Sequence, residues 1–234
     1  FGIKQVNFDD DTFGISKKNI KAINNLIHDE VPNMTYTCET VVQLAKDVDV
    51  IKDMKHGGCT GVFVGIESGN NEILKSIKKT QTIDECIQAM KNLRNHGIES
   101  HAFIMVGFPK ETEETFKQTI DFIPKLKPDN VIFSIFTPYP GSDLYYECKD
   151  SGIIDGEFDL SLYNHQSPLN CFTKNIPKER FYELRKRAVK FVDKYNRKSK
   201  FRRGVTSLRN IGIIATFRKV MSYIYSRFVS YKNA

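Results

Sequence analysis

Glu67 and Ser68 are the first candidates for chemistry, because they directly follow a short apolar segment at 61–66 and stand between Gly65 and Gly69. A carboxylate accepts hydrogen bonds, a hydroxyl donates and accepts them, and glycine lets a ligand approach the backbone. Parallel barrels present their sites in this way, with polar side chains at the ends of buried strands. We therefore expect a binding site at this point.

Three adjacent carboxylates, Asp9, Asp10 and Asp11, form a second candidate between Phe8 and Phe13. Like charges repel, so this run is unfavourable unless a cation or hydrogen-bond donors approach it. The alternative is an acidic loop that caps the following helix. For this segment taken alone, that alternative is preferred.

Two later loops and one pair of lysines are the remaining candidates for a functional site. The loops run over 107–112 and 137–142 and combine glycine and proline with aromatic and polar side chains. Ordinary turn and capping chemistry also explains both loops. Lys78 and Lys79 follow the Glu67 segment and could bind a carboxylate.

The elements that would position these side chains repeat a strand followed by a helix. Apolar runs predict strands at 2–8, 34–38, 61–65, 98–106 and 131–136. Caps and apolar periodicity predict helices after Ser16, across 44–54, after the capping box Thr82 to Glu85, and after Thr112, with a further helix over 177–195. Pro124 should kink or end the helix that starts after Thr112.

A repeat of about 30 residues between strand ends matches right-handed βα units, so the sequence predicts an α/β fold with a partial (βα) TIM-like barrel. The first strand begins at the first residues, and we therefore expect the barrel to lack its first βα unit. The expected domains are the barrel over 1–151, a loop and C-terminal helix over 152–199, and a basic aromatic helical tail over 200–234. Within the second domain, 156–172 is interpreted as a lid or substrate loop.

Charge is distributed unevenly along the chain. All 28 acidic residues lie at or before Asp193, whereas 11 of the 35 lysines and arginines follow it. This tail also contains Phe201, Phe217, Tyr223, Tyr225, Phe228 and Tyr231. It could bind nucleic acid, an anionic membrane surface or an acidic partner, or it could be a solvated helical appendage that packs on the body.

The five cysteines are expected to be reduced thiols. Cys38, Cys59, Cys86, Cys148 and Cys171 are odd in number, and their smallest separation is 21 residues. This number and spacing of cysteines indicates a cytoplasmic protein without a disulfide framework. The cysteines also do not have the spacing of metal ligands. With the basic tail, the location would be cytoplasmic or membrane-peripheral.

Four motifs resemble those of radical S-adenosylmethionine (SAM) enzymes, most closely the branch that often carries an amino-terminal cobalamin-binding domain. They are Phe-x-Asp-Asp-x-Phe at 8–13, Gly-Ile-Glu-Ser-Gly at 65–69, Gly-Phe-Pro-x-Glu-Thr at 107–112 and Thr-Pro-Tyr-Pro-Gly at 137–141. The resemblance covers residues 2–151. Each motif alone is weak, but their order and separations together are specific.

The resemblance implies SAM held across the barrel opening. By motif position, Asp10 and Asp11 would meet the methionyl ammonium, Glu67 and Ser68 the ribose or amino-acid part, and Lys79 the carboxylate. The remaining cofactor-binding positions would be Phe13 of the first motif and, on the adenine side, Gly107, Phe136, Thr137, Pro138 and Tyr139. No catalytic residue is assigned.

In such enzymes a [4Fe-4S] cluster on a CxxxCxxC loop passes an electron to the sulfonium and releases a 5′-deoxyadenosyl radical that takes hydrogen from the substrate. That loop is absent here, so the ligands are expected upstream, with cobalamin in a preceding domain. A second departure is Val41, where relatives commonly carry arginine. No ligand for a metal is expected within the chain itself.

We therefore expect the SAM-binding portion of a radical SAM enzyme, which would cleave SAM reductively for hydrogen abstraction or methyl transfer. It would need an electron donor and an unknown small-molecule or peptide substrate, and it would be inactive alone. The alternative is a non-catalytic, degenerate barrel or a binding module that acts through its basic tail.

Overall fold

The computed structural model describes residues 2–154, 164, 167 and 169–232, with side chains described up to residue 205 of the last helix. The chain divides into two compact units, Phe1–Val192 and Asp193–Ala234. Each unit is described by itself. The domain boundaries predicted after residues 151 and 199 stay predictions.

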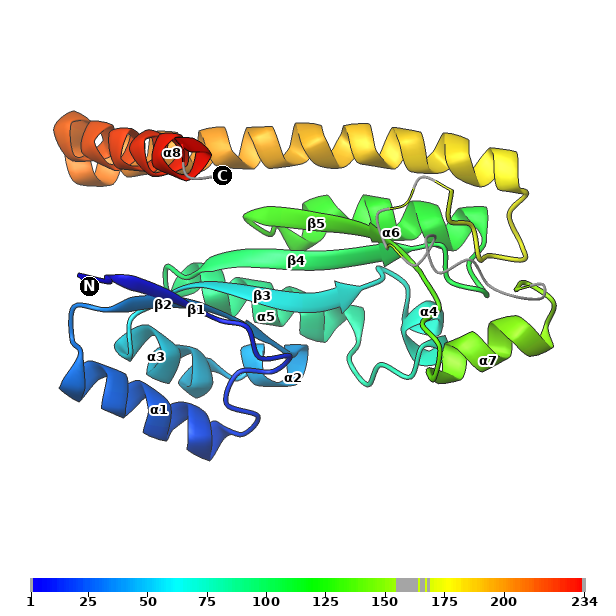
Figure 1. Cartoon of the computed structure of the whole chain (residues 1–234), viewed down its shortest axis with the longest axis horizontal. Helices are drawn as coiled ribbons and strands as arrows, with labels where there is room; N and C mark the ends of the chain where they lie inside the picture. Colours follow the sequence, from blue (N-terminus) through cyan, green and yellow to red (C-terminus); the bar gives the residue numbers. More distant parts are fainter. Residues whose placement is uncertain (1, 155–163, 165–166, 168, 233–234) are drawn as a thin grey trace. The chain divides into compact units, whose positions relative to one another are not determined.

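Within the described part of the first unit, five parallel strands form one sheet (Figure 1). They are β1 (Gln5–Phe8), β2 (Thr35–Thr40), β3 (Cys59–Glu67), β4 (Glu99–Val106) and β5 (Asn130–Ile135). Each strand pairs with its neighbours in the chain, in the order β1-β2-β3-β4-β5. Consecutive parallel strands of this kind confirm the predicted α/β fold of the partial-barrel type.

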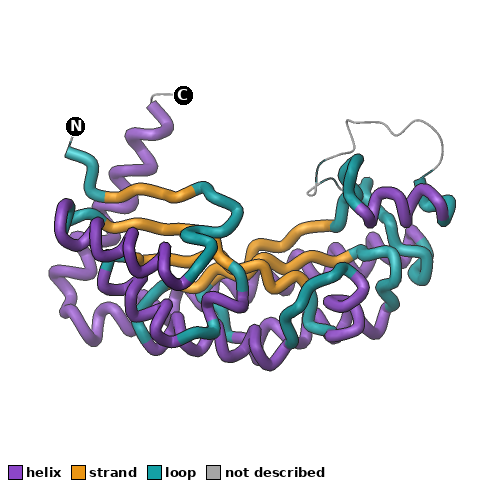
Figure 2. The backbone as a smooth tube through the Cα atoms, turned by 90° about the horizontal axis from the view of Figure 1, so that it is seen from below, coloured by secondary structure: helices purple, strands orange, loops and turns teal. Residues whose placement is uncertain are grey.

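The helices that follow β1 to β4 lie on the convex side of the curved sheet, as the tube in Figure 2 shows. The described helices are α1 (Lys17–Glu30), α2 (Val42–Ala45), α3 (Val48–His56), α4 (Asn71–Ser76), α5 (Ile83–Asn95), α6 (Glu113–Leu126), α7 (Asp143–Asp150) and α8 (Lys178–Lys232).

The two faces of the sheet differ because successive side chains of a strand point to opposite sides. Along β2 and β4 every second residue is buried. Cys38 and Ala102 are examples of fully buried residues in these strands. On the opposite face, Glu39, Phe63 and His101 lie in register on three neighbouring strands and are partly exposed. The strand ends therefore present side chains over an open concave surface.

The predicted caps are confirmed: the side chains of Ser16, Thr82 and Thr112 each accept a hydrogen bond from the first turn of α1, α5 and α6. Pro124 does not end α6 directly. It lies in the last turn, where few backbone bonds remain to be lost, and the helix ends two residues later at Leu126.

The single helix predicted across 44–54 is wrong, because two helices occupy this segment. Asp47 interrupts it and caps α3 by accepting hydrogen bonds from the backbone N–H groups of Asp49 and Val50. The short helix α4 was not predicted. Asn70 caps it through Ile73 N–H, but six residues are too few to show a helical period.

Much of the predicted lid over 156–172 lies outside the described residues. In the second unit the side chains of the predicted tail aromatics after residue 205 also lie outside them, while Phe201 is 74% exposed. Binding of this tail to an anionic surface stays a prediction. None of the described helices combines the length and apolar character needed to cross a membrane.

Candidate functional site

A cleft of about 460 Å³ lies beside the carboxyl ends of β2 and β3. Its lining comes from the end of β2 and the start of α2, from the concave side of β3, and from the segment 78–81 between α4 and α5. Asp11 and Phe103 complete it. In Figure 1 the strand arrows point toward this end of the sheet, where α4 also lies.

Two of the lining residues, Lys79 and Glu67, form an ion pair in which Lys79 Nζ lies 3.0 Å from Glu67 Oε1. The Glu67 side chain is 16% exposed and that of Lys79 is 39% exposed, so both remain accessible to a ligand. Glu67 has a positive φ of 67° at a register shift between β3 and β4, which turns the chain at this point.

Gly65 makes room for this pair. A Cβ at that position would lie 2.9 Å from Glu67 Oε1 and 3.6 Å from Lys79 Nζ. Any larger residue would push the carboxylate away from its present position. The glycine therefore allows the charged pair to lie close to the strand.

Two further carboxylates, Glu39 and Asp11, line the cleft. Burial, followed by the nearby charges of Asp9 and Asp11, raises the pKa of the Glu39 carboxyl above its ordinary value. A cationic ligand group would relieve this repulsion. Because its lining contains both lysines and carboxylates, the cleft matches a ligand that carries both charges.

Several lining residues, among them Glu39, were not predicted as site residues from the sequence. Gln81 donates its amide to the Gly65 carbonyl at 2.9 Å, and Gln43 donates to the Thr80 hydroxyl at 3.0 Å, so both fix the segment that carries Lys79. Thr40 also lines the cleft and is only 4% exposed. No motif or spacing marks these positions.

Of the predicted site residues, the structure brings Asp11, Glu67 and Lys79 together around one cleft. Asp10 is exposed but is not among the lining residues. Phe13 is buried and packs on Phe8 and Tyr36, with ring centroids 5.0 and 5.2 Å apart. Its position is that of a core residue beneath the acidic loop.

Ser68 is not brought to the cleft. Its side chain is fully buried, and its hydroxyl lies 3.0 Å from the Thr119 hydroxyl of α6 and accepts the Asn70 N–H. Because the backbone turns at Glu67, the two neighbouring side chains face different surroundings. The hydroxyl therefore holds α6 and the start of α4 against the end of β3.

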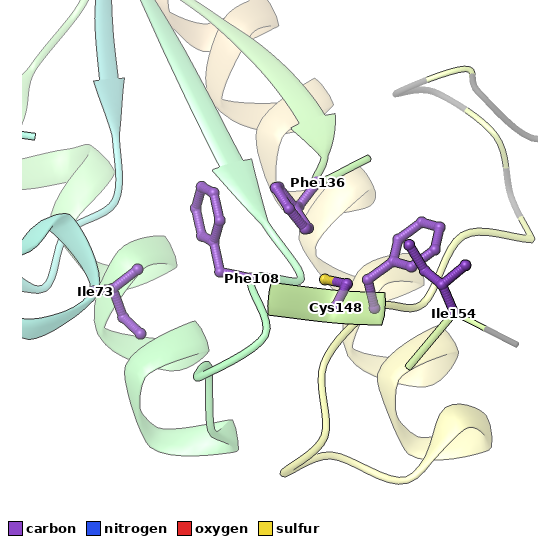
Figure 3. Packing of buried hydrophobic residues seen from close by; sticks show 6 residues of the cluster. Ile73, Phe108, Phe136, Cys148 and Ile154 are labelled. Atoms are coloured by element: carbon purple, nitrogen blue, oxygen red, sulfur yellow. The ribbon is translucent and has the colours of Figure 1, made fainter. Parts of the chain in front are cut away.

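The residues predicted on the adenine side do not line this cleft either. Phe136 is buried and packs on Phe108 at 5.2 Å between ring centroids, in the cluster that Figure 3 shows at the ends of β4 and β5. The Thr137 hydroxyl accepts a hydrogen bond from Asn170 at 2.7 Å.

The other two predicted residues of this loop differ from each other, since Pro138 is buried and Tyr139 is exposed. Gly107 has a φ of 90°, and a Cβ there would lie 2.9 Å from Phe181 Cζ of α8.

Comparisons with known proteins agree with this geometry. The family model of the radical SAM superfamily matches residues 2–123. The chain belongs to the radical SAM superfamily. It is 39% identical over 145 residues to an uncharacterised methyltransferase of Pyrococcus horikoshii, over 62% of this chain and 31% of the relative. It is 28% identical over 153 residues to the anaerobic magnesium-protoporphyrin IX monomethyl ester cyclase of Rubrivivax gelatinosus, over 65% of this chain and 27% of the relative.

Among solved structures, the radical SAM methyltransferase TsrM of Kitasatospora setae, with cobalamin and a [4Fe-4S] cluster bound, matches with a TM-score of 0.57 and 20% identity. The match covers 64% of this chain and 31% of that protein, and it shows a common fold. The chain thus spans about a third or less of the length of these relatives.

Radical SAM enzymes use a [4Fe-4S] cluster, but the cysteines described here do not fit one. Cys38, Cys59, Cys86 and Cys148 are buried in four different elements. Burial raises the pKa of Cys86 to about 12 and that of Cys148 to about 11, whereas cluster ligands are thiolates. No group of three or more His, Cys, Asp or Glu within the described residues could hold a metal ion. We assign no cluster ligand to this chain.

SAM, in contrast, fits the cleft by charge. Its methionyl part carries a carboxylate and an ammonium, which match the ammonium of Lys79 and the carboxylates of Asp11 and Glu39 in the lining.

Proposed function

We propose that the cleft binds SAM in a radical SAM enzyme and holds the amino-acid part of that molecule. The observation that supports this is the accessible Lys79–Glu67 pair, which lines a cleft at the strand ends together with the carboxylates of Asp11 and Glu39. Lys79 would bind the ligand carboxylate, and Asp11 with Glu39 would bind its ammonium.

The protein's own residues would hold and orient the ligand. A lysine ammonium has three donors, so Lys79 can keep Glu67 as a partner while it binds a second carboxylate. Glu67 fixes the direction of the lysine, and Gln81 with Gln43 fixes the segment that carries it. The ordering of these side chains before binding reduces the entropy lost on association.

The reaction of the whole protein is part of the same proposal. Bound SAM supplies the sulfonium whose reductive cleavage the family uses for hydrogen abstraction or methyl transfer. Relatives described as methyltransferases favour methyl transfer, with cobalamin as a further cofactor of the full protein. The cluster, its electron donor and the substrate would be held by parts other than the residues described here.

Calorimetric titration of the purified full-length protein with SAM, without reductant and without oxygen, tests this proposal. We expect Lys79→Met to weaken SAM binding about 10-fold or more, because it removes a charge-assisted hydrogen bond of about 1.5–3 kcal/mol. Glu67→Gln should weaken binding less. The control is Lys75→Met, which removes an exposed lysine of α4 that does not line the cleft.

Binding of SAM with the same affinity by wild type and Lys79→Met, at unchanged melting temperature, would overturn the proposal. No SAM binding by the wild type would favour the alternative of a degenerate barrel.

A further inference from the structure

Positive charge is concentrated in the last helix, α8, directly after Asp193. Five of the nine residues over 194–202 are exposed lysines or arginines, and no acidic residue follows Asp193 in the sequence. Among these charges the Phe201 side chain is 74% exposed. A surface groove on this stretch is lined by two aromatic and three basic residues, which are Tyr195, Phe201, Arg197, Lys198 and Arg202.

Further along the same helix, apolar residues recur with a helical period. The backbone of α8 is helical as far as Lys232. Apolar residues three and four positions apart share one face of a helix, and here they are Ile213, Phe217, Val220, Ile224, Phe228 and Tyr231. By the same period, Lys219, Ser222, Ser226 and Ser230 fall on the opposite face. The pattern is that of an amphipathic helix.

A basic cluster and an apolar helix face together match the surface of an anionic lipid bilayer. Lysine and arginine bind the lipid phosphates, and each basic residue near such a surface strengthens binding about 5-fold. Aromatic and aliphatic residues enter the boundary between headgroups and acyl chains. Aromatic rings such as the exposed Phe201 are favoured at the level of the headgroups.

Two other partners each explain only part of this pattern. A nucleic acid would account for the basic and aromatic residues over 194–202, but not for an apolar face that recurs over 213–231. A second copy of the helix would cover the apolar face. It would, however, bring together the 11 lysines and arginines that follow Asp193 in each copy, with no carboxylate in the segment to balance them.

We propose that the segment 194–232 of α8 binds the surface of an anionic lipid bilayer as an amphipathic helix. Arg197 and Lys198 would bind lipid phosphates, and the apolar face over 213–231 would lie in the headgroup region. This role goes beyond the proposed function, which concerns the cleft, and it does not depend on SAM binding. Its effect would be to attach the protein to a membrane surface.

Co-sedimentation of the full-length protein with lipid vesicles tests the charge part of this proposal. We expect binding to vesicles of equal parts phosphatidylcholine and phosphatidylserine, none to phosphatidylcholine alone, and a loss of binding as salt is added. The double variant Arg197→Gln with Lys198→Gln should bind about 10-fold more weakly or less. Lys18→Gln with Lys21→Gln changes the net charge equally at exposed positions of α1 and should bind like wild type.

Phe217→Ser tests the apolar face in the same assay. It should weaken binding to the anionic vesicles about 10-fold, because the ring no longer enters the lipid boundary. The matched control is Tyr223→Ser, which also replaces an aromatic residue by serine but lies outside the apolar spacing. It should bind within about 3-fold of wild type. Neither variant should change the melting temperature of the protein without vesicles.

Four results would overturn the inference. The first is equal vesicle binding by wild type and the Arg197→Gln, Lys198→Gln variant, and the second is an equal loss for Phe217→Ser and Tyr223→Ser. The third is tighter binding to a mixed-sequence RNA than to the anionic vesicles, which would identify a nucleic-acid surface. The fourth is a lower melting temperature, or conversion of an oligomer to a monomer in sedimentation velocity, for Phe217→Ser alone, because the apolar face would then be covered by protein.

Discussion

Glu67 and Glu111 follow neighbouring strands, yet their carboxylates have opposite surroundings. Glu67, at the end of β3, is partly exposed in the cleft and paired with Lys79 at 3.0 Å. Glu111, in the loop after β4, is fully buried and accepts a hydrogen bond from the Gly107 backbone through one oxygen, while its other oxygen has no partner. The first carboxylate can meet a ligand, and the second is held inside the protein.

Contacts with the C-terminal part of the first unit explain this difference. The Thr173 hydroxyl donates to the Glu111 carbonyl at 2.9 Å, Lys174 N–H donates to the Pro109 carbonyl at 3.2 Å, and Phe181 packs against Gly107. These contacts cover the loop after β4. No such covering by described residues reaches the cleft after β2 and β3, so motifs of similar composition are packed in one place and line an open cleft in the other.

The largest effect that we expect is on the free energy of unfolding, and it comes from the buried carboxyl of Glu111. Burial raises its pKa from 4.5 to about 8, so the folded protein keeps a proton that the unfolded chain loses. The contribution of Glu111 to stability should therefore be complete below about pH 4.5 and should fall as the pH rises toward 8, by as much as about 1.4 kcal/mol per pH unit. Glu111→Gln should remove this slope in urea unfolding measured between pH 5 and 8.

Glu113→Gln is the control for this slope. A hydrogen bond from Arg180 lowers the pKa of Glu113, so its contribution is lost only in acid. Its unfolding free energy should keep the wild-type slope between pH 5 and 8. Parallel slopes for wild type and Glu111→Gln would show that the buried carboxyl does not control stability.

Gly107→Ala should destabilise the protein by about 2–4 kcal/mol, because the new Cβ meets the buried Phe181 ring and the backbone has a positive φ. Gly141→Ala has the same φ of 90° but nothing within 4 Å, so only the backbone strain of about 1 kcal/mol should appear. Chemical denaturation measures both. If both variants lost the same free energy of unfolding, the contact between Gly107 and Phe181 of α8 would not contribute to the cost of Gly107→Ala.

Ser68→Ala should cost about 1–2 kcal/mol of stability, because it leaves the Asn70 N–H without its side-chain partner and removes the contact to Thr119. SAM affinity should not change once stability is taken into account. Ser76→Ala, which removes one bond to the Ile73 carbonyl on α4, is the comparison. A loss of SAM affinity at unchanged stability would instead place Ser68 in the binding site.

Two neighbouring carboxylates give the smallest expected effect. Asp11 lines the cleft and Asp10 does not, although the motif predicts a ligand contact for both. Asp11→Asn should weaken SAM binding by about 2-fold to 5-fold, since the site is open to solvent that screens its charge. Asp10→Asn should leave the affinity unchanged in the same titration, and the reverse order would show that the loop turns when SAM binds.

The strand–helix repeat was predictable because apolar periodicity and caps such as Thr82 and Thr112 are local signals. The helix α4 and the break at Asp47 were not predicted, because segments of four to six residues show too little of a helical period. Local sequence patterns therefore predict the order of the helices and strands better than they predict the residues at which each element begins and ends.

Of the site residues that the sequence predicted, Asp11, Glu67 and Lys79 line the cleft, whereas Ser68 does not. A motif groups residues that are close in sequence, but the register shift and the positive φ at Glu67 decide which side chain faces the cleft. Gln81 was not predicted, because its hydrogen bond to the Gly65 carbonyl joins two segments that residue spacing does not connect.

Hydrogen–deuterium exchange of the full-length protein, with and without SAM, tests most directly whether the cleft after β2 and β3 is the binding site. Each amide reports the local opening of its own segment, so ligand protection locates the contact. We predict slower exchange on SAM addition in 39–43 and 78–82, and loss of this protection in Lys79→Met. Protection confined to 107–112 and 136–139, with 39–43 and 78–82 unchanged, would contradict the account.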